Sequence, residues 1–352
     1  MKKKVLSLSL ALILVLGLLL AGCKDEKANQ PIVTEGQIIV LVPEAAAGWD
    51  AAVVKYAQEE AAAMTGGITA EVRTSASAKD QIAQIDSICA STTPPAGVIV
   101  YPYDKTLESS MSKLADSGIP FLQFERIFDT EAVNSDVVAN IKGDITGVGK
   151  EVALRFINDG MEPGDKTFVL VADTSADSDA RKKGFTAILL DNGWTEQQIS
   201  ENIVYSRSAE NDRAAAQQIF TEWIAEKSVE ELAQYHYVFA NTDEMALGIL
   251  QALAGDGVEQ AKKDIFLTST MAMGSSQGVS ELYRALDGTH ENAAYPNIIA
   301  NIDVFSVTYD PAMIKTAMRT LVSYLGGEKI VRDHTLGVEI VDYVNASEYP
   351  GY

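Results

Sequence analysis

The sequence predicts an α/β protein built from two doubly wound parallel-sheet lobes. From Gln37 onward, short apolar runs alternate with longer amphipathic segments, and the alternation breaks off and restarts near residue 166. Strand and helix alternating at this spacing indicate parallel strands joined by crossover helices. About 316 residues follow residue 36, which is too long a chain for one ordinary hydrophobic core and agrees with two lobes.

The first half of the pattern begins with the apolar run IIVLV at 38–42, which is typical of a buried strand. Pro94 and Pro95 interrupt the helical pattern before the third strand, because proline cannot continue a helix. We expect strands over 38–42, 68–74, 96–102 and 119–125, and helices over 49–64, 78–90 and 104–117.

The second half repeats the pattern from residue 166. We expect strands over 166–173, 203–208, 264–270 and 297–304, and a strand that runs into a loop over 235–244. We expect helices over about 179–192, 212–227, 244–254 and about 276–286. In open parallel sheets, ligands bind beyond the carboxyl ends of the strands. The residues just after each strand are therefore the candidates for a binding site.

Aromatic, charged and amide side chains gather at these strand ends. Such side chains suit a sugar, because flat rings cover its apolar face and charged or amide groups bond to its hydroxyls. The candidates are Trp49, Tyr101, Tyr103, Glu125, Arg126, Asp177, Asp179, Arg181, Asn211, Asp212, Asn241, Thr242, Asp243, Thr270, Met271, Tyr309 and Asp310.

The amino-terminal residues have the features of an export signal. Lys2, Lys3 and Lys4 precede an uncharged apolar run, which ends at Leu-Ala-Gly-Cys23. This ending resembles the bacterial lipoprotein processing box, which implies a signal peptide over 1–22, two acyl chains on Cys23 and a polar tether over 23–36. The resemblance places the protein outside the cytoplasm, lipid-anchored to the outer face of the cell membrane. An uncleaved anchor helix is the alternative.

Composition argues against several functions. The net charge of −21 disfavours nucleic acid and anionic lipid as partners. The three histidines are far apart, and the sequence has no metal-binding spacing, Walker loop or Gly-x-Ser-x-Gly motif. We therefore expect neither catalysis nor a metal or cofactor. Cys89 lies on the apolar face of a predicted helix, where a buried structural thiol is expected.

Four segments resemble the type I periplasmic-type sugar-binding proteins, the ribose, galactose and arabinose binders of ABC transporters. The most specific is VFANTDEMALGILQAL, which follows that family's Asn-Asp-x-Met-Ala-x-Gly signature. The others are the stretch from AKDQIAQ to LQFER, the helix start DSDARKKGF and the hinge segment YDPAMIKTAM. The similarity extends from Gln37 to about Asp342.

The resemblance implies that a three-strand hinge joins the lobes, with crossings near 138–140, 307–309 and 335–338. The first lobe would comprise 37–139 plus 310–334, and the second 140–309 plus 335–352. A monosaccharide would bind between the lobes, which close on it and present it to an ABC permease with its ATPase. The resemblance also favours a monomer.

The family's ligand positions fall on particular residues of this sequence. Trp49 matches a stacking aromatic, Glu125 and Arg126 match a pair that clamps hydroxyls, and Arg181 matches a helix-start arginine that follows Asp177 and Asp179. Four positions depart from the family pattern: Asn211, Thr242, Met271 (or Thr270) and Tyr309. These departures distinguish the site from those of the ribose, glucose and arabinose binders. A nucleoside, a polyol or a furanosyl signal stays an alternative ligand, and a sensory receptor an alternative role.

Several candidates also have a purely structural interpretation. Asp243 either binds ligand or caps the helix that follows, since Asp is a good N-cap residue. Arg126 binds ligand or forms a hinge salt bridge. Tyr101 and Tyr103 line the cleft or pack on the hinge. Trp194 and Trp223 lie in helical contexts and are expected to pack in the core or on the surface.

Overall fold

The computed structural model describes residues 32–46, 48–268, 272–274, 276, 278–287, 295–349 and 351–352. The predicted signal peptide, Cys23, Thr270 and Met271 lie outside these residues. Within the described part of the chain, no helix is long and apolar enough to cross a membrane.

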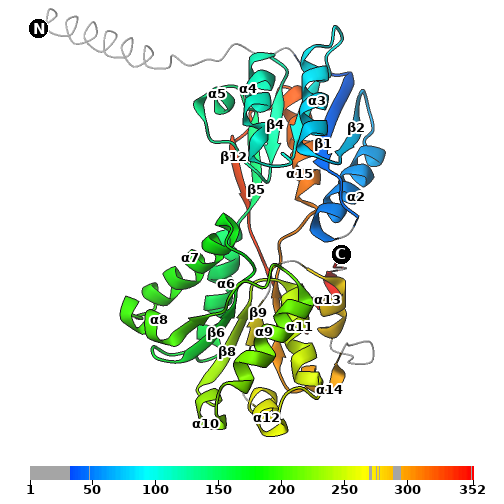
Figure 1. The fold of residues 1–352 in the computed structure, drawn as a ribbon. Coiled ribbons are helices and arrows are strands. Elements are labelled where there is room, and N and C mark those ends of the chain that lie inside the picture. Colours follow the sequence, from blue (N-terminus) through cyan, green and yellow to red (C-terminus); the bar gives the residue numbers. More distant parts are fainter. Residues whose placement is uncertain are drawn as a thin grey trace, which may run out of the picture.

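The first lobe contains a six-stranded sheet in which every pair of neighbouring strands is parallel (Figure 1). Its spatial order is β12-β5-β4-β3-β1-β2. The strands are β1 (Gly36–Pro43), β2 (Ile68–Ser75), β3 (Gly97–Val100), β4 (Phe121–Phe124), β5 (Ala139–Gly143) and β12 (Asp333–Leu336). The helices are α2 (Gly48–Ala63), α3 (Ala78–Cys89), η1 (Lys105–Leu107), α4 (Glu108–Asp116), α5 (Glu131–Asn134) and α15 (Met313–Leu325).

Both faces of this sheet are buried, as the apolar run at its centre predicts. Ile38, Val40 and Val42 pack in one cluster with α2 and α15. Ile39 and Leu41 point to the opposite face and pack with α3 and α4. A parallel strand covered on both faces needs apolar residues at every position, which explains the unbroken run.

The second lobe has a parallel sheet in the order β10-β9-β8-β6-β7. Its strands are β6 (Lys166–Leu170), β7 (Ile203–Tyr205), β8 (Tyr235–Ala240), β9 (Ala272–Gly274) and β10 (Asp303–Val304). Helices α6 (Ile145–Asn158) and α7 (Ala176–Asp191) pack on one face, and α9 (Arg213–Ala225) and α11 (Asp243–Ala254) on the other. The remaining helices are α8 (Glu196–Asn202), α10 (Val229–Leu232), α12 (Gln260–Thr268), α13 (Ser280–Ala285), α14 (Pro296–Ile299) and η2 (Ala346–Glu348).

Two strand predictions in this lobe are wrong. Residues 264–268 belong to helix α12, and most of 297–304 forms α14 and a turn before the short strand β10. A short apolar run fits a buried strand or one helical face equally well, and packing decides between them. Here Phe266 is fully buried against Phe220, with ring centroids 5.5 Å apart. Pro296, at the first turn of α14, is a helix-start signal that the prediction did not use.

The chain passes between the two sheets three times. It crosses after β5, after the short strand β11 (Ser306–Val307) and after β12, and β11 pairs antiparallel with β13 (Ile340–Val341). The lobe boundaries predicted at 139/140 and 334/335 fall inside β5 and β12, both of which belong to the first sheet. The first sheet therefore extends to Gly143 and Leu336.

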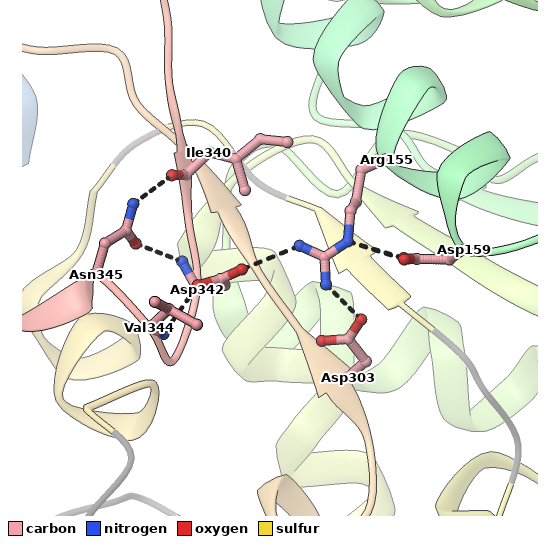
Figure 2. A network of polar contacts seen from close by, with 7 residues as sticks. All are labelled: Arg155, Asp159, Asp303, Ile340, Asp342, Val344 and Asn345. Atoms are coloured by element: carbon pink, nitrogen blue, oxygen red, sulfur yellow. Dashed lines mark hydrogen bonds and ion pairs between the residues drawn. The ribbon is translucent and has the colours of Figure 1, made fainter.

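One arginine holds together the second-lobe ends of these crossings. Figure 2 shows Arg155 of α6 bonded to Asp159 (2.9 Å), Asp303 (2.7 Å) and Asp342 (3.1 Å), and its guanidinium lies 5.1 Å from the Phe305 ring centroid. Burial lowers the pKa of Arg155, but Asp303 and Asp159 outweigh burial and raise the pKa above its usual value. The cluster fixes α6, β10 and the segment after β13 to one another.

Candidate ligand-binding site

The first lobe presents an aromatic cluster at the junction of the lobes. Trp49, half-buried in the first turn of α2, stacks on Phe124 with centroids 6.4 Å and planes 9° apart. Its Nε1–H donates to the carbonyl of Tyr309 (2.7 Å). Tyr101 packs edge-on against Trp49, and its hydroxyl donates to Asp50 (2.8 Å). The polar atoms of this cluster thus have partners within the protein.

Arg126 follows β4 and is exposed, but its position is well defined. Its Nη1 donates to the carbonyls of Pro102 (2.7 Å) and Tyr103 (2.6 Å), and the guanidinium lies 4.8 Å from the Tyr101 ring centroid. These contacts belong to the first lobe.

Glu125 and Tyr309 form a hydrogen-bonded pair at the junction, and the pKa of each side chain is raised. The Tyr309 hydroxyl donates to Glu125 Oε1. Burial raises the pKa of the Glu125 carboxyl to about 7, against the lowering effect of this hydrogen bond, and nearby Asp177 raises it further. The Gly143 N–H also lowers this pKa, and Oε2 is buried without a hydrogen-bond partner among the described residues. Glu125 also has a left-handed backbone (φ 65°), a strained conformation typical of functional positions.

Glycine at position 143 makes room for this pair. A Cβ there would lie 2.4 Å from the Tyr309 ring, closer than van der Waals contact allows. The tyrosine ring therefore lies directly on the end of β5, where its hydroxyl reaches Glu125.

Arg181 faces the same junction from the second lobe. It lies on α7 and is only 7 % exposed, and burial lowers the pKa of its guanidinium while nearby Asp177 and Tyr309 raise it. Its Nε is buried and has no hydrogen-bond partner among the described residues. A buried donor without a partner costs about 1–3 kcal/mol, so a group that bonds to it gains that much.

Close packing of α6 and α7 sets the position of Arg181. A Cβ at Gly149 would lie 1.9 Å from the carbonyl oxygen of Arg181, and a Cβ at Gly184 would lie 2.0 Å from that of Thr146. The two helices are thus in backbone contact, which only glycine permits at these positions.

The two acidic residues at the start of α7, Asp177 and Asp179, lie at different places. Asp177 and Asp179 are both exposed. Asp177 lies near Glu125, Tyr309 and Arg181, whereas Asp179 lines a cavity of about 320 Å³ under the helix start. Polar groups of Asp173, Lys182 and Asn241 lie at this cavity, and Val169, Phe185, Tyr205 and Phe239 contribute apolar lining.

The three residues of the Asn-Thr-Asp segment are buried and bonded to protein. Asn241 accepts from Ala172 N–H (3.2 Å), and Thr242 caps α11 by accepting from Met245 N–H (3.4 Å). Asp243 is fully buried and accepts from Val279 N–H (2.7 Å) and the Ser306 hydroxyl (2.9 Å). The alternative of Asp243 as the N-cap is therefore wrong, because Thr242 has that position.

Other candidates are exposed or pack within a single lobe. Asn211 is exposed with φ 57°, and Tyr103 packs against the first-lobe core while its hydroxyl donates to Ala76 O (3.3 Å). Trp194 and Trp223 pack in the second-lobe core, as predicted. Cys89 is half-buried, and burial raises the pKa of its thiol.

Sequence reasoning missed two aromatic residues near the site. Phe124, on which Trp49 stacks, is the last residue of β4 and was included in the predicted core strand. Tyr352 lies beyond Asp342, where the motif resemblance ends. The residues described in the structure contain no His, Cys, Asp and Glu group able to hold a metal ion.

Comparison with known proteins identifies the family. The sequence profile described as the periplasmic binding protein domain matches residues 38–329, most of the chain. The chain belongs to the periplasmic binding protein family. The family and the fold predicted from the sequence are thereby confirmed. This family consists of solute-binding proteins and not of enzymes.

This periplasmic binding protein is similar to the following proteins at low sequence identity. The fructose import binding protein FruE of Bifidobacterium longum is 23 % identical over 268 residues, which are 75 % of this chain and 69 % of that protein. The structure resembles a ribose ABC transporter protein of Conexibacter woesei (TM-score 0.68, 14 % identity, 91 % and 96 % of the two chains). It also resembles a galactofuranose binding protein (TM-score 0.63, 19 % identity, 89 % and 97 % of the two chains).

Proposed function

We propose that this protein is the solute-binding component of an ABC importer and captures a monosaccharide between its two lobes. The observation that supports it most is the juxtaposition at the junction. Trp49 and Glu125 come from the first lobe, and Arg181 with its unpartnered Nε comes from the second. A ring face and hydrogen-bonding groups of both kinds suit a polyhydroxylated ring.

The mechanism we propose is closure without chemistry. A sugar first stacks on the preformed aromatic cluster of the first lobe. Rotation about the three crossings then brings Arg181 and Asp177 onto its hydroxyls, as in hinge closure of two-lobed binding proteins. The closed form presents both lobes to a permease, and a separate ATPase supplies the energy. Nothing in this cycle requires a cofactor, and the binding unit acts as a monomer.

We propose a ketose or furanose as the first ligand to test. The Bifidobacterium longum relative is named a fructose import binding protein. Among the structural neighbours, one is a galactofuranose binding protein, and two others contain bound arabinofuranose and fucofuranose. A polyol is the second candidate, because one neighbour is described with bound myo-inositol. A sensory role would use the same binding step and differ only in the membrane partner.

The family places the protein outside the cytoplasm, and we propose that lipid on Cys23 anchors it there. The support is the sequence of the first 26 residues, in which three lysines and an apolar run precede Ala-Gly-Cys and then a charged segment. Expression in a bacterial host followed by mass spectrometry should find a diacylated mature chain beginning at Cys23. The variant Cys23→Ala should lose the membrane fraction, and an unchanged membrane fraction would contradict the anchor.

The binding proposal is tested by calorimetric titration of the full chain in mild detergent. The panel contains D-fructose, D-allose, L-arabinose, D-galactose, D-ribose, myo-inositol and adenosine. We expect one sugar or polyol to bind and to raise the melting temperature by mass action. Binding of adenosine alone would replace the sugar by a nucleoside, and binding of none would contradict the proposal.

A further inference from the structure

The end of the sequence is built into the second lobe at the side that faces the first. Val341 and Ala346 belong to the second-lobe core. The Tyr349 ring packs edge-on against Tyr283 of α13, with centroids 6.1 Å apart. Figure 1 places the end of the chain beside α13, at the end of the second lobe nearest α2. Residues 351 and 352 thus reach the junction from an anchored segment.

Two backbone hydrogen bonds fix Tyr352 on the segment before α13. Its N–H donates to the Gly278 carbonyl (3.0 Å), and its carbonyl accepts from Ser280 N–H (3.2 Å). Gly278 and Gly351 both have positive φ (72° and 62°), and a Cβ at Gly351 would lie 2.5 Å from Ser280 Cα. Such a close approach is open only to glycine, so the tail occupies a fitted position.

The Tyr352 side chain points to the charged groups of the junction. A Cβ at Gly278 would lie 2.9 Å from Tyr352 Cε1, so the ring lies on this glycine. Asp243, Tyr283, Asp310 and Arg181 lie close enough to Tyr352 to shift the pKa of its hydroxyl, and Tyr352 in turn influences the pKa of Arg181. The tyrosine therefore shares one region with the buried arginine of α7.

Arg181 and Tyr352 each bury a polar atom that the described protein does not satisfy. Arg181 Nε and the Tyr352 hydroxyl are both shielded from solvent without a hydrogen-bond partner among the described residues. Buried polar groups almost always have partners, so a ligand group that bonded to both atoms would gain free energy there. One ligand hydroxyl has the capacity to accept from Arg181 Nε–H and to donate to the tyrosine oxygen.

We propose that Tyr352 is a ligand-binding residue, which forms the aromatic wall of the second lobe opposite Trp49 and shares a ligand hydroxyl with Arg181. Position 211, one of the four positions that depart from the family pattern, holds an exposed Asn and supplies no aromatic ring. Tyr352 supplies a ring and a hydroxyl at once, so it favours polyhydroxylated rings over flat apolar ligands. This inference rests on the proposed sugar-binding function.

The test compares Tyr352→Phe and Tyr352→Ala with the wild-type full chain in titrations with D-fructose and the other sugars of the panel. Loss of one hydrogen bond should weaken binding about 3- to 10-fold in Tyr352→Phe. Loss of the ring as well should weaken it about 10- to 100-fold in Tyr352→Ala. Tyr343→Ala is the matched control, since Tyr343 lies in the same segment but is 65 % exposed, and it should bind like the wild type.

A second readout needs no ligand. Because the hydroxyl is buried without a partner, Tyr352→Phe should keep or raise the melting temperature of the sugar-free protein. A lower melting temperature would mean that the hydroxyl has a partner in the protein and would overturn the inference. If the wild type bound a sugar and Tyr352→Ala bound it equally well or more tightly, this inference would be overturned while the proposed function stood. If the wild type bound no panel compound, the proposed function would fail and this inference with it.

Discussion

The two sides of the lobe junction differ in how completely the protein satisfies its own polar groups. On the first-lobe side, the Trp49 N–H, the Tyr101 hydroxyl and Arg126 Nη1 all donate to protein oxygens. On the second-lobe side, Arg181 Nε and the Tyr352 hydroxyl are buried without partners among the described residues. Apart from Glu125 Oε2, the first wall therefore satisfies its own polar groups without a ligand, and the second does not.

This difference implies an order of events. A complete wall is preorganised, so a ligand that docks on it spends little free energy on ordering side chains. The unsatisfied wall gains most from the ligand, so its hydrogen bonds favour the closed state. The first lobe would then determine where the sugar lies, and the second how tightly it is held.

Glu125 is the exception on the first-lobe side, and its titration should give the largest effect. The carboxyl keeps its proton to a pKa of about 7 when folded, against 4.5 ordinarily. Between these values the folded state binds more protons than the unfolded one, so the free energy of unfolding falls as pH rises, by about 3 kcal/mol in total. Glu125→Gln should lack this component in urea unfolding at pH 5 and pH 8.

Glu328→Gln, an exposed substitution in the first lobe, is the control and should keep the wild-type pH dependence. If Glu125→Gln retained the full pH dependence, Glu125 would have to be ionised in the folded protein.

Arg181→Ala tests the second wall and should have the next largest effect. Hydrogen bonds to a charged group contribute about 1.5–3 kcal/mol, so we expect sugar affinity to fall about 100-fold in calorimetric titration. Arg207→Ala is the matched control, because this second-lobe arginine is exposed and pairs with Glu222 (2.9 Å). Equal affinity in both variants would remove Arg181 from the site.

Trp49 tests the first wall, where smaller effects are expected because the protein satisfies its own groups there. Trp49→Ala removes the ring and should weaken sugar binding about 10-fold, in line with aromatic contacts of about 0.5–1.5 kcal/mol. Trp49→Phe keeps a ring but loses the hydrogen bond to the Tyr309 carbonyl, so its sugar affinity should lie between those of the wild type and Trp49→Ala. A loss larger than that of Arg181→Ala would reverse the comparison of the two walls.

Asn211 should give the smallest effect, because it is exposed. Asn211→Ala should leave sugar affinity within twofold of the wild type, about the precision of a titration. Its left-handed backbone favours Asn over Ala, so the free energy of unfolding should fall by about 1 kcal/mol or less. A marked loss of affinity would place this loop in the closed site.

The sequence predicted the elements that periodicity specifies strongly and failed where it does not. The central strand β1 and helix α2 were found within about two residues, because a continuous apolar run and a long amphipathic segment each have one good solution. The short run around Phe266 has two solutions, and only its packing on Phe220 selects the helix. Fold class was therefore predictable and some elements of the second lobe were not.

Residue type and position identified candidates for the site, but not how deeply each side chain is buried or which groups it contacts. Arg181 and Asp243 were both named, yet their burial depends on contacts far away in sequence, such as the approach of Gly149 to α7 and of Ser306 to Asp243. Tyr352 was missed because no strand end precedes it and it lies outside the family's motifs. Its place at the junction follows only from the path of the last segment.

The Arg155 cluster gives the junction a mechanical property. Arg155 lies on the element that follows the first crossing, Asp303 on the strand that precedes the second, and Asp342 on the segment that follows the third (Figure 2). One guanidinium thus clamps the second-lobe ends of all three linkers into a single frame. We therefore expect the proposed rotation between the lobes to occur in the backbone between this cluster and the first sheet, with the three linkers moving together.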